Sequence, residues 1–141
     1  MTRHMLIFGM GYSASRLAER LRGDGWTVTG TRREASEGVI AFDDQPAVLA
    51  ALAAATHILS SVPPASDDSE PVLDHYGEAI SSASLQWSGY LSATGVYGDV
   101  DGAWVDESAP IGSGRRKARS KADPRWQELR DDMHVFRLPG I

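Results

Sequence analysis

Cysteine is absent from the 141 residues of this sequence, which excludes disulfide scaffolds, zinc ribbons, iron–sulfur sites and cysteine nucleophiles. The four histidines are scattered and show no metal-ligand spacing. No apolar run approaches the ~18 residues of a membrane-spanning helix, and the N-terminal residues lack the cleavage site of a secretory signal. We therefore expect a cytoplasmic protein with no metal centre and no membrane partner.

Hydrophobic residues make up 42% and charged residues 23% of the chain, as in an ordinary globular protein. At this length we expect a single domain covering residues 1–141. The formal net charge of −5 disfavours nucleic acid as a partner. A basic run at residues 115–125 leaves two interpretations open, an anionic partner or a solvated helix face, and the acidic net charge favours the second.

Apolar runs of strand length alternate with stretches of helical periodicity along the whole chain. Residues 5–8 are continuously apolar, which is typical of a strand buried on both faces, and apolar residues then recur at helical spacing over 14–21. This alternation predicts parallel strands joined by right-handed crossovers, with helices on both faces of the sheet. We expect an α/β, Rossmann-type, doubly wound sheet of about six strands in the order 3-2-1-4-5-6. The expected strands are 5–8, 26–29, 39–42, 56–60, 87–92 and 134–138, and the later helices are 46–55, 71–84 and 120–130.

The turn after the first expected strand, residues 9–14, reads G-M-G-Y-S-A and fits the pattern G-x-G-x-x-A. Gly9 permits a tight turn, Gly11 lets a diphosphate approach the backbone, and Ala14 lets the helix lie close to the sheet. The free N–H groups and the dipole at the start of the helix then face the phosphates. Because a strand precedes the turn and a helix follows it, the pattern predicts dinucleotide binding, and an ordinary strand-to-helix turn is the alternative. The residues expected to contact the cofactor here are Gly9, Gly11, Tyr12, Ser13 and Ala14.

The end of the second expected strand bears on the choice of dinucleotide. An NAD site usually has an acidic residue there, whereas this sequence has Thr31, Arg32 and Arg33. Guanidinium groups bind phosphate in bidentate fashion, so we favour NADP, with NAD as the alternative. Solvated loop arginines are the interpretation that involves no ligand. Further residues expected near the cofactor follow the third and fourth strands and are Asp43, Ser60, Ser61 and Val62.

Residues 90–99 read Y-L-S-A-T-G-V-Y-G-D, and residues 104–110 read W-V-D-E-S-A-P. Together with the glycine turn, they resemble the extended and atypical short-chain dehydrogenase/reductases, the NAD-dependent epimerase/dehydratase-like group. The resemblance implies a Rossmann fold, a dinucleotide cofactor, and an oxidoreductase or epimerase acting on a hydroxyl or carbonyl of a sugar-like or nucleotide-linked small molecule. In that family a Ser or Thr at the end of the fifth strand, a Tyr, and a Lys four residues after the Tyr form the catalytic set, with the Tyr as acid or base.

The sequence departs from this catalytic set. Ala93 stands at the hydroxyl position, and no tyrosine follows Tyr97, so the Tyr-x-x-x-Lys motif is missing. Thr94 and Lys117 are the remaining candidates for catalytic residues. An enzyme is therefore one hypothesis, and a catalytically inactive dinucleotide-binding module, such as a sensor or partner subunit, is the other. A third hypothesis is a site for S-adenosylmethionine at the glycine turn, but the 90–99 segment does not fit it.

Members of that family continue after the sixth strand with a further strand and a substrate-binding region, whereas this sequence stops at Ile141. We expect either a fragment of a longer protein or a truncated homologue, with an incomplete substrate pocket. The sixth strand would then be an unprotected sheet edge, which favours pairing with another chain. The sequence therefore predicts self-association.

Overall fold

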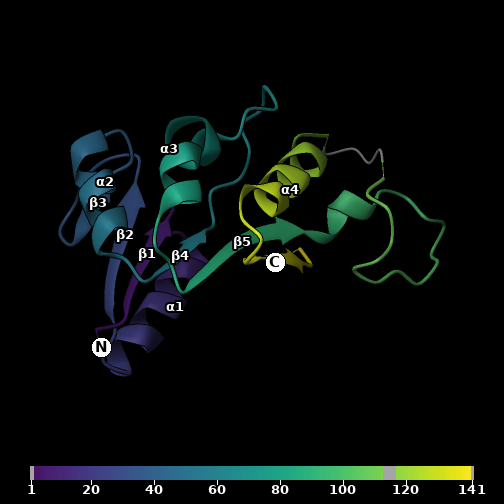
Figure 1. The fold of residues 1–141 in the computed structure, drawn as a ribbon. Helices are drawn as coiled ribbons and strands as arrows, with labels where there is room; N and C mark the ends of the chain where they lie inside the picture. The colour runs from purple at the N-terminus through teal and green to yellow at the C-terminus, as the bar shows by residue number, and fades with distance from the viewer. Residues whose placement is uncertain (1, 113–116, 141) are drawn as a thin grey trace.

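The computed structural model describes residues 2–112 and 117–140, which form a six-stranded parallel sheet in the order β3-β2-β1-β4-β5-β6 (Figure 1). The predicted α/β Rossmann-type fold and strand order are confirmed. The strands are β1 (His4–Phe8), β2 (Thr27–Arg32), β3 (Val39–Ala41), β4 (His57–Ser60), β5 (Trp87–Ala93) and β6 (Met133–Leu138). The helices are α1 (Tyr12–Gly23), α2 (Gln45–Ala54), α3 (Pro71–Ser82) and α4 (Lys117–Leu129), and a 3₁₀ turn, η1 (Thr94–Tyr97), follows β5.

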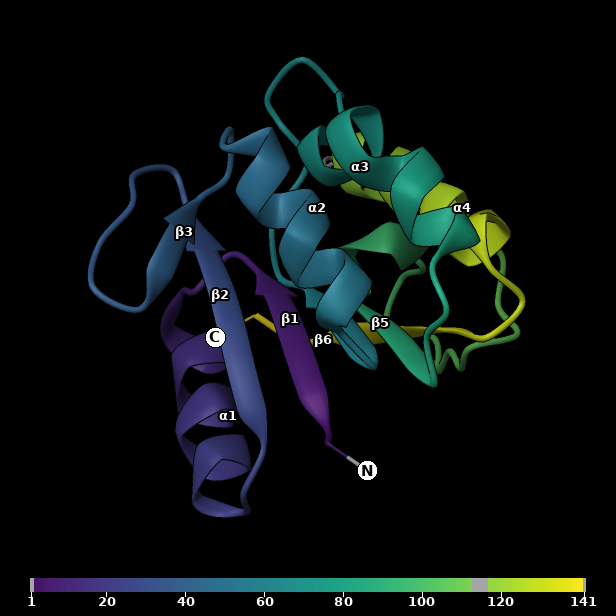
Figure 2. The same ribbon diagram turned by 60° about the vertical axis from the view of Figure 1, so that its left-hand side comes forward.

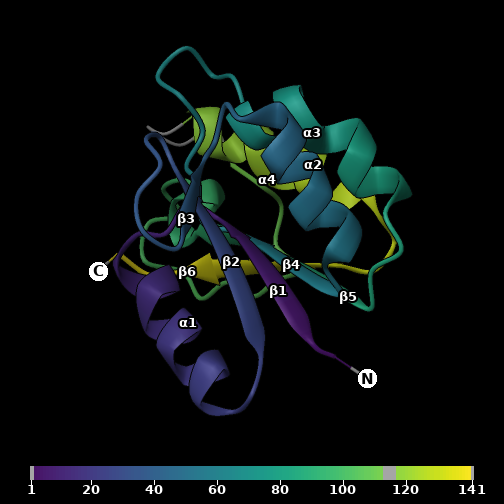
Figure 3. The same ribbon diagram turned by 90° about the vertical axis from the view of Figure 1, so that its left-hand side faces the viewer.

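The helices divide unequally between the two faces of the sheet. Helix α1 lies on one face, and α2, α3 and α4 lie together on the other (Figures 2 and 3). Each face has its own apolar core, a larger one beneath the three helices and a smaller one beneath α1. Among the described helices, none is both long and apolar enough to cross a membrane.

Strand β1 lies in the middle of the sheet between β2 and β4, and both of its faces are apolar. Leu6 and Phe8 belong to the larger core, whereas Met5 and Ile7 belong to the smaller one. All four side chains are buried, as expected for a parallel strand with helices on both sides and side chains that alternate between the faces. The continuous apolar run in the sequence therefore places the glycine turn at the carboxyl end of the sheet's centre.

Strand β2 extends three residues beyond its predicted end. Gly30 pairs with Ile7 of β1 on one side and Val39 of β3 on the other, and this double pairing holds a glycine that would otherwise weaken a strand. A Cβ on Gly30 would lie 2.1 Å from Cγ of Met10. The methionine side chain that follows Gly9 therefore fills the space above the strand.

Two helices begin as their sequences indicate. Asp44 caps α2 by accepting a hydrogen bond from the Ala47 N–H at 3.2 Å, as predicted, and Pro46 lies in the first turn. Glu70 caps α3 in the same way, through the Val72 N–H at 3.2 Å, with Pro71 following it. The two caps fix where these helices start on the larger core.

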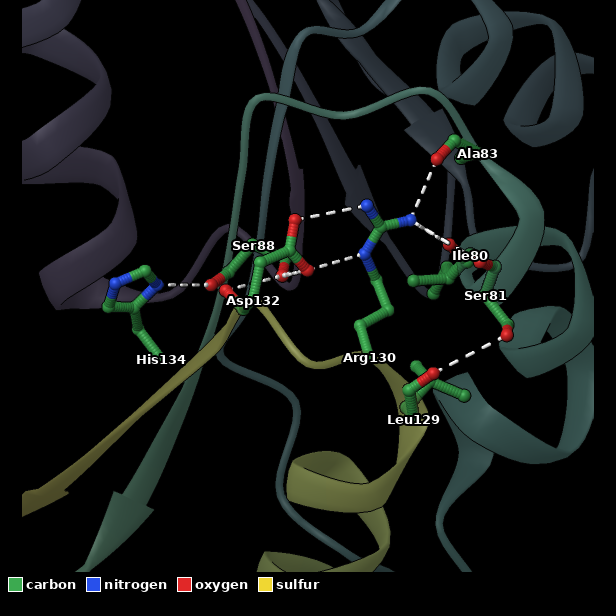
Figure 4. Close-up of polar contacts among 8 residues, drawn as sticks. All are labelled: Ile80, Ser81, Ala83, Ser88, Leu129, Arg130, Asp132 and His134. Carbon is green, nitrogen blue, oxygen red and sulfur yellow. Dashed lines mark hydrogen bonds and ion pairs between the residues drawn. The ribbon is translucent and has the colours of Figure 1, made fainter.

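Arg130 joins the end of α3 to Asp132, which directly precedes β6 (Figure 4). This junction lies at the amino ends of β5 and β6, whereas the glycine turn follows the carboxyl end of β1. Its Nη1 donates to the carbonyl oxygens of Ile80 at 3.0 Å and Ala83 at 2.7 Å, where α3 ends. Its Nε and Nη2 donate to the carboxylate of Asp132 at 2.8 and 3.1 Å, and Ser88 also donates to that carboxylate. A cation at a helix C-terminus satisfies carbonyl groups that have no partner within the helix.

Candidate functional site

Gly9 makes the turn out of β1 and is held on two sides. Its φ of +87° is a conformation that other residues rarely adopt. Its N–H donates to Oγ1 of Thr31 at 3.1 Å, and the next N–H, that of Met10, donates to the Thr31 carbonyl at 2.9 Å. A Cβ at Gly9 would lie 2.9 Å from Oγ of Ser61 and from Cγ2 of Val62. The turn therefore requires glycine for its backbone angle and for its close approach to the segment after β4.

Gly11 leaves the start of α1 open. It is the N-cap residue of α1, it contributes no side-chain cap, and the first turn of the helix contains no acidic residue. A Cβ at Gly11 would meet no atom of the described residues within 4 Å, whereas Ala14 is 1% exposed and lies against the sheet. The first N–H groups of a helix have no intrahelical acceptor, so an uncapped start presents donors and the positive end of the helix dipole. This geometry fits a diphosphate.

A first hollow, of about 650 Å³, extends from the glycine turn to the end of β2. Within the described part of the chain, its lining includes three arginine side chains, Arg16, Arg32 and Arg33, and one acidic side chain, Glu19. The guanidinium of Arg16 lies 5.4 Å from the ring centroid of Tyr12, within the range of a cation–π interaction. The hollow is lined by Gly9, Met10, Gly11, Tyr12, Ser15, Arg16, Glu19, Arg32 and Arg33.

The other residues predicted to contact a cofactor have different placements. Thr31 is 1% exposed and its hydroxyl is used by the Gly9 N–H, so it supports the turn from beneath. Ser61 lines the second hollow described below, and its hydroxyl donates to the Gly9 carbonyl. Ser60 is buried, and Val62 packs on the larger core. Asp43 is exposed and lines none of the hollows described here.

A second hollow lies on the other side of the glycine turn, and the two meet at Gly11 and Tyr12. It extends across the carboxyl ends of β5 and β6, and Arg119 of α4 is the one cationic side chain that lines it among the described residues. The lining residues are Gly11, Tyr12, Ser13, Ala14, Ser61, Leu91, Ser92, Ala93, Arg119, Leu138, Pro139 and Gly140.

Thr94 and Lys117, the two predicted catalytic residues, are not among the lining residues of the second hollow. Thr94 is exposed in η1, one residue beyond Ala93, which does line the hollow. Lys117 is exposed and lines a neighbouring depression with Pro63, Pro64 and Asp68. Arg119 lies between this depression and the second hollow and lines both. The structure therefore brings the glycine turn, the end of β5 and Arg119 together, and leaves both predicted catalytic side chains outside.

A buried ionic network fixes the end of β5. Asp123 of α4, which is fully buried, accepts two hydrogen bonds from Arg137 of β6, both at 3.1 Å, and one from the Ser92 hydroxyl at 2.7 Å. Arg137 also donates to the Tyr97 hydroxyl at 3.2 Å. Burial disfavours the charged form of Asp123, but the hydrogen bonds from Arg137, Ser92 and Gln127 outweigh it and hold the pKa of this carboxyl below its usual value. The Ser92 hydroxyl is thus engaged inside the fold.

Sequence reasoning missed Arg16 and Arg119. Arg16 follows the glycine turn by little more than one helical turn, so its position in the helix could have suggested it. Arg119 belonged to the basic run for which a solvated helix face was favoured, and residues 115 and 116 of that run lie outside the described residues. Ala122 and Trp126 are both buried. An apolar stripe at 122 and 126 continues to 119 at helical spacing, which was the available signal that Arg119 faces the sheet.

No protein-family model matches the chain, and no curated protein sequence matches it either. Solved structures do match. A structure from Methylobacillus flagellatus, assigned as an NAD-dependent epimerase/dehydratase, is 24% identical with a TM-score of 0.73, and the alignment covers 96% of this chain and 53% of that one. A short-chain dehydrogenase/reductase superfamily protein from Agrobacterium tumefaciens with bound NAD is 20% identical with a TM-score of 0.69. The alignment covers 87% of this chain and 44% of that one.

A third structure is a UDP-glucuronic acid 4-epimerase from Bacillus cereus, in complex with NAD and UDP-4-deoxy-4-fluoro-glucuronic acid. It is 14% identical with a TM-score of 0.72, and the alignment covers 95% of this chain and 55% of that one. The chain thus spans about half the length of the solved structures that it matches. In its fold, the chain is a Rossmann-type α/β unit like those of NAD-dependent epimerase/dehydratase and short-chain dehydrogenase/reductase structures.

Proposed function

We propose that this chain binds a dinucleotide, with the diphosphate at the uncapped start of α1 and the adenosine part in the first hollow. The open backbone at Gly11 supports the position of the diphosphate, because no side chain in the described part of the chain fills that space. The three arginines around the first hollow carry the proposal furthest, because they supply positive charge where the adenine ribose of a Rossmann cofactor lies.

NADP is the preferred cofactor in this proposal, with NAD as the weaker ligand. Arg32 ends β2 and Arg33 follows it, the position at which an NAD site carries a carboxylate for the ribose hydroxyls. Arg16 adds a third guanidinium from α1. Guanidinium groups match the 2′-phosphate of NADP by charge and by paired hydrogen bonds, whereas NAD lacks that phosphate.

Calorimetric titration of the chain with NADPH and NADH tests this assignment. We expect NADPH to bind at least about tenfold more tightly than NADH, because hydrogen bonds to charged groups contribute about 1.5–3 kcal/mol each. The double variant R32Q/R33Q should lose this preference and leave NADH affinity nearly unchanged. R20Q/R125Q removes two exposed arginines outside both hollows and serves as the charge-matched control. Equal affinity of the native chain for NADH and NADPH would refute the NADP assignment.

For the reaction, we propose an oxidoreductase or epimerase acting on a hydroxyl or carbonyl of a sugar-like or nucleotide-linked substrate. When bound, the nicotinamide would supply or accept a hydride. The second hollow supports this choice, because it adjoins the glycine turn at Gly11 and extends to the ends of β5 and β6. The nucleotide-sugar and NAD complexes among structures of the same fold point to the same substrate class.

A non-catalytic dinucleotide-binding module is the second candidate function. One observation favours it: in the described residues, neither Thr94 nor Lys117 lines the second hollow. Assays of NADPH oxidation with aldehydes, ketones and nucleotide sugars distinguish the non-catalytic module from the enzyme. Tight NADPH binding without turnover of any substrate supports the module. Hydride transfer supports the enzyme, and its loss on Lys117→Ala would assign that lysine to catalysis.

We also propose that copies of the chain associate through β6. In the described sheet β6 pairs with β5 alone, so its other edge presents free backbone groups, and Phe136 is 40% exposed. Sedimentation velocity over increasing protein concentration should show a dimer or larger species. Phe136→Lys should shift the equilibrium towards monomer, whereas a monomer at every concentration of the native chain would refute this proposal.

A further inference from the structure

The guanidinium of Arg119 lines the second hollow and forms no ion pair with the carboxylates of the described residues. Its Nη1 donates to the hydroxyl of Tyr90 at 2.7 Å and to the carbonyl of Leu91 at 3.1 Å. Both bonds leave from one nitrogen, so the hydrogen bonds between described residues leave Nε and Nη2 for a ligand. Among the described residues, no carboxylate side chain lines this hollow and no salt bridge includes Arg119.

Two other cations on the same helix provide a contrast. Lys121 pairs with Asp68 at 2.8 Å and Arg125 pairs with Asp74 at 3.0 Å, and all four side chains are substantially exposed. Exposed pairs of this kind contribute little to stability and fit the solvated face that the sequence suggested. Arg119 alone of these three cations turns towards the end of β5, where its guanidinium lies 5.8 Å from the ring centroid of Tyr90.

The position of Arg119 is set by a rigid support. Tyr90 is fully buried and stacks on Trp126, which is also fully buried, with ring centroids 4.8 Å apart and ring planes 10° apart. Burial raises the pKa of the Tyr90 phenol to about 12, so its hydroxyl stays neutral and accepts from the guanidinium at physiological pH. A guanidinium that the fold already orients loses less conformational freedom when it binds an anion.

We propose that Arg119 binds an acidic group of the substrate, a carboxylate or a phosphate, in the second hollow beside the cofactor, and that Tyr90 positions it. The inference rests on the proposed dinucleotide function and narrows its substrate class. The diphosphate of the cofactor already has the start of α1 as its positive partner. Arg119 is anchored instead to β5, and its hollow extends to the end of β6. A planar guanidinium with two free donor positions matches a carboxylate or phosphate oxygen pair.

Inorganic phosphate is the probe, and the Nε–H signals of arginine in ¹H–¹⁵N NMR spectra are the residue-specific readout. The Arg119 signal is assigned by its loss in R119Q. Phosphate is titrated into the chain alone and into the chain saturated with NADPH. We expect a saturable shift of the Arg119 signal in both titrations. Because R119Q lacks the Arg119 signal, the phosphate affinity of the NADPH-saturated variants is measured by calorimetry, and we expect a loss of roughly tenfold or more in R119Q.

Three further variants separate positioning from charge. Y90F keeps the stacked ring and removes the hydroxyl, so it should weaken phosphate binding several-fold while NADPH affinity stays within about twofold. R119K keeps the charge without the planar pair of donors and should recover only part of the affinity. R125Q removes one charge from the same helix outside the hollow and should leave phosphate binding unchanged.

The outcomes distinguish this inference from the proposed cofactor function. If phosphate shifts the signals of Arg16, Arg32 and Arg33 but leaves that of Arg119 unmoved, the inference is wrong even when NADPH binds. If saturation with NADPH abolishes the Arg119 shift, Arg119 contacts the cofactor and the substrate assignment is wrong. If NADPH fails to bind while phosphate still shifts Arg119 saturably, the anion site stands and the dinucleotide proposal fails.

Discussion

The carboxylate of Asp123 and the guanidinium of Arg137 form a two-pronged ion pair inside the protein, with both hydrogen bonds at 3.1 Å and side-chain exposures of 0% and 12%. The pair joins α4 to β6, and through Ser92 and Tyr97 it also reaches β5 and η1. A charged pair out of water is stable only when its remaining donors and acceptors are engaged. The pair therefore connects α4, β5 and β6, which form the side of the second hollow that faces the glycine turn.

Replacing Asp123 by Asn keeps the size of the side chain and removes its charge, which leaves the Arg137 guanidinium without its partner. We expect the free energy of unfolding at pH 7 to fall by about 3 kcal/mol, the loss typical of breaking one side of a buried pair. Because the folded-state pKa of Asp123 lies below its unfolded value, its stabilisation is present above the unfolded value of 3.8 and is lost as pH falls through the folded value. Urea unfolding from pH 7 to pH 2.5 measures this. A variant that keeps the acid sensitivity of the native chain would contradict the assignment.

Ionisation of Glu70 should change the stability of the protein with pH in the direction opposite to that of Asp123. It is fully buried, and its Oε2 has no hydrogen-bond partner among the described residues. Burial raises the pKa of Glu70 despite smaller opposing influences from Trp126, Val72, Arg125 and Arg119. Its contribution is present below the unfolded pKa of 4.5 and is lost as pH rises through the raised folded value. In Glu70→Gln the Oε1 still accepts from Val72, so the helix cap is retained. We expect the stability of the variant relative to the native chain to rise as pH increases from 4.5. Thermal unfolding of both proteins at each pH measures this difference.

Gly11→Ala tests the open backbone at the start of α1. The added Cβ meets no atom within 4 Å in residues 2–112 and 117–140, and Gly11 has an ordinary negative φ, so the melting temperature should change by no more than about 2 °C. The methyl group points into the space assigned to the diphosphate, so NADPH affinity should fall by roughly tenfold or more. Gly23→Ala, also with nothing within 4 Å and at the other end of α1, is the control. Unchanged NADPH affinity in Gly11→Ala would show that the diphosphate lies elsewhere.

Arg130→Gln tests the junction between α3 and the strands. The substitution removes the donor shared by the Ile80 and Ala83 carbonyls and the partner of Asp132. We expect a loss of about 1–3 kcal/mol in unfolding free energy, because carbonyl groups at the helix end lose their donor. Arg125→Gln, which breaks an exposed pair, should cost less than about 1 kcal/mol. Equal losses in the two variants would mean that Arg130 acts as an ordinary surface charge.

The sequence was sufficient for the architecture because its signals are local. The apolar run over residues 5–8, the glycine turn after it and the Asp44 cap each follow from a few consecutive residues, and alternating strands and helices leave little choice of topology. It was insufficient for strand ends such as that of β2, because Gly30 is held by pairing with Ile7 and Val39, which lie 23 and nine positions from it in the chain.

The candidate site also combines features that follow from the local sequence with features that depend on the tertiary structure. The sequence by itself determined the glycine turn and the arginine pair at the end of β2, because backbone freedom and charge belong to those residues alone. Only the tertiary structure decided that Arg119 and the end of β5 share one hollow while Thr94 and Lys117 lie outside it. The direction in which a helix side chain points depends on which face of the helix packs against the sheet. For α4 that face is set by burial of Trp126 on Tyr90 and by the Asp123–Arg137 pair, contacts between residues up to 36 positions apart in the chain.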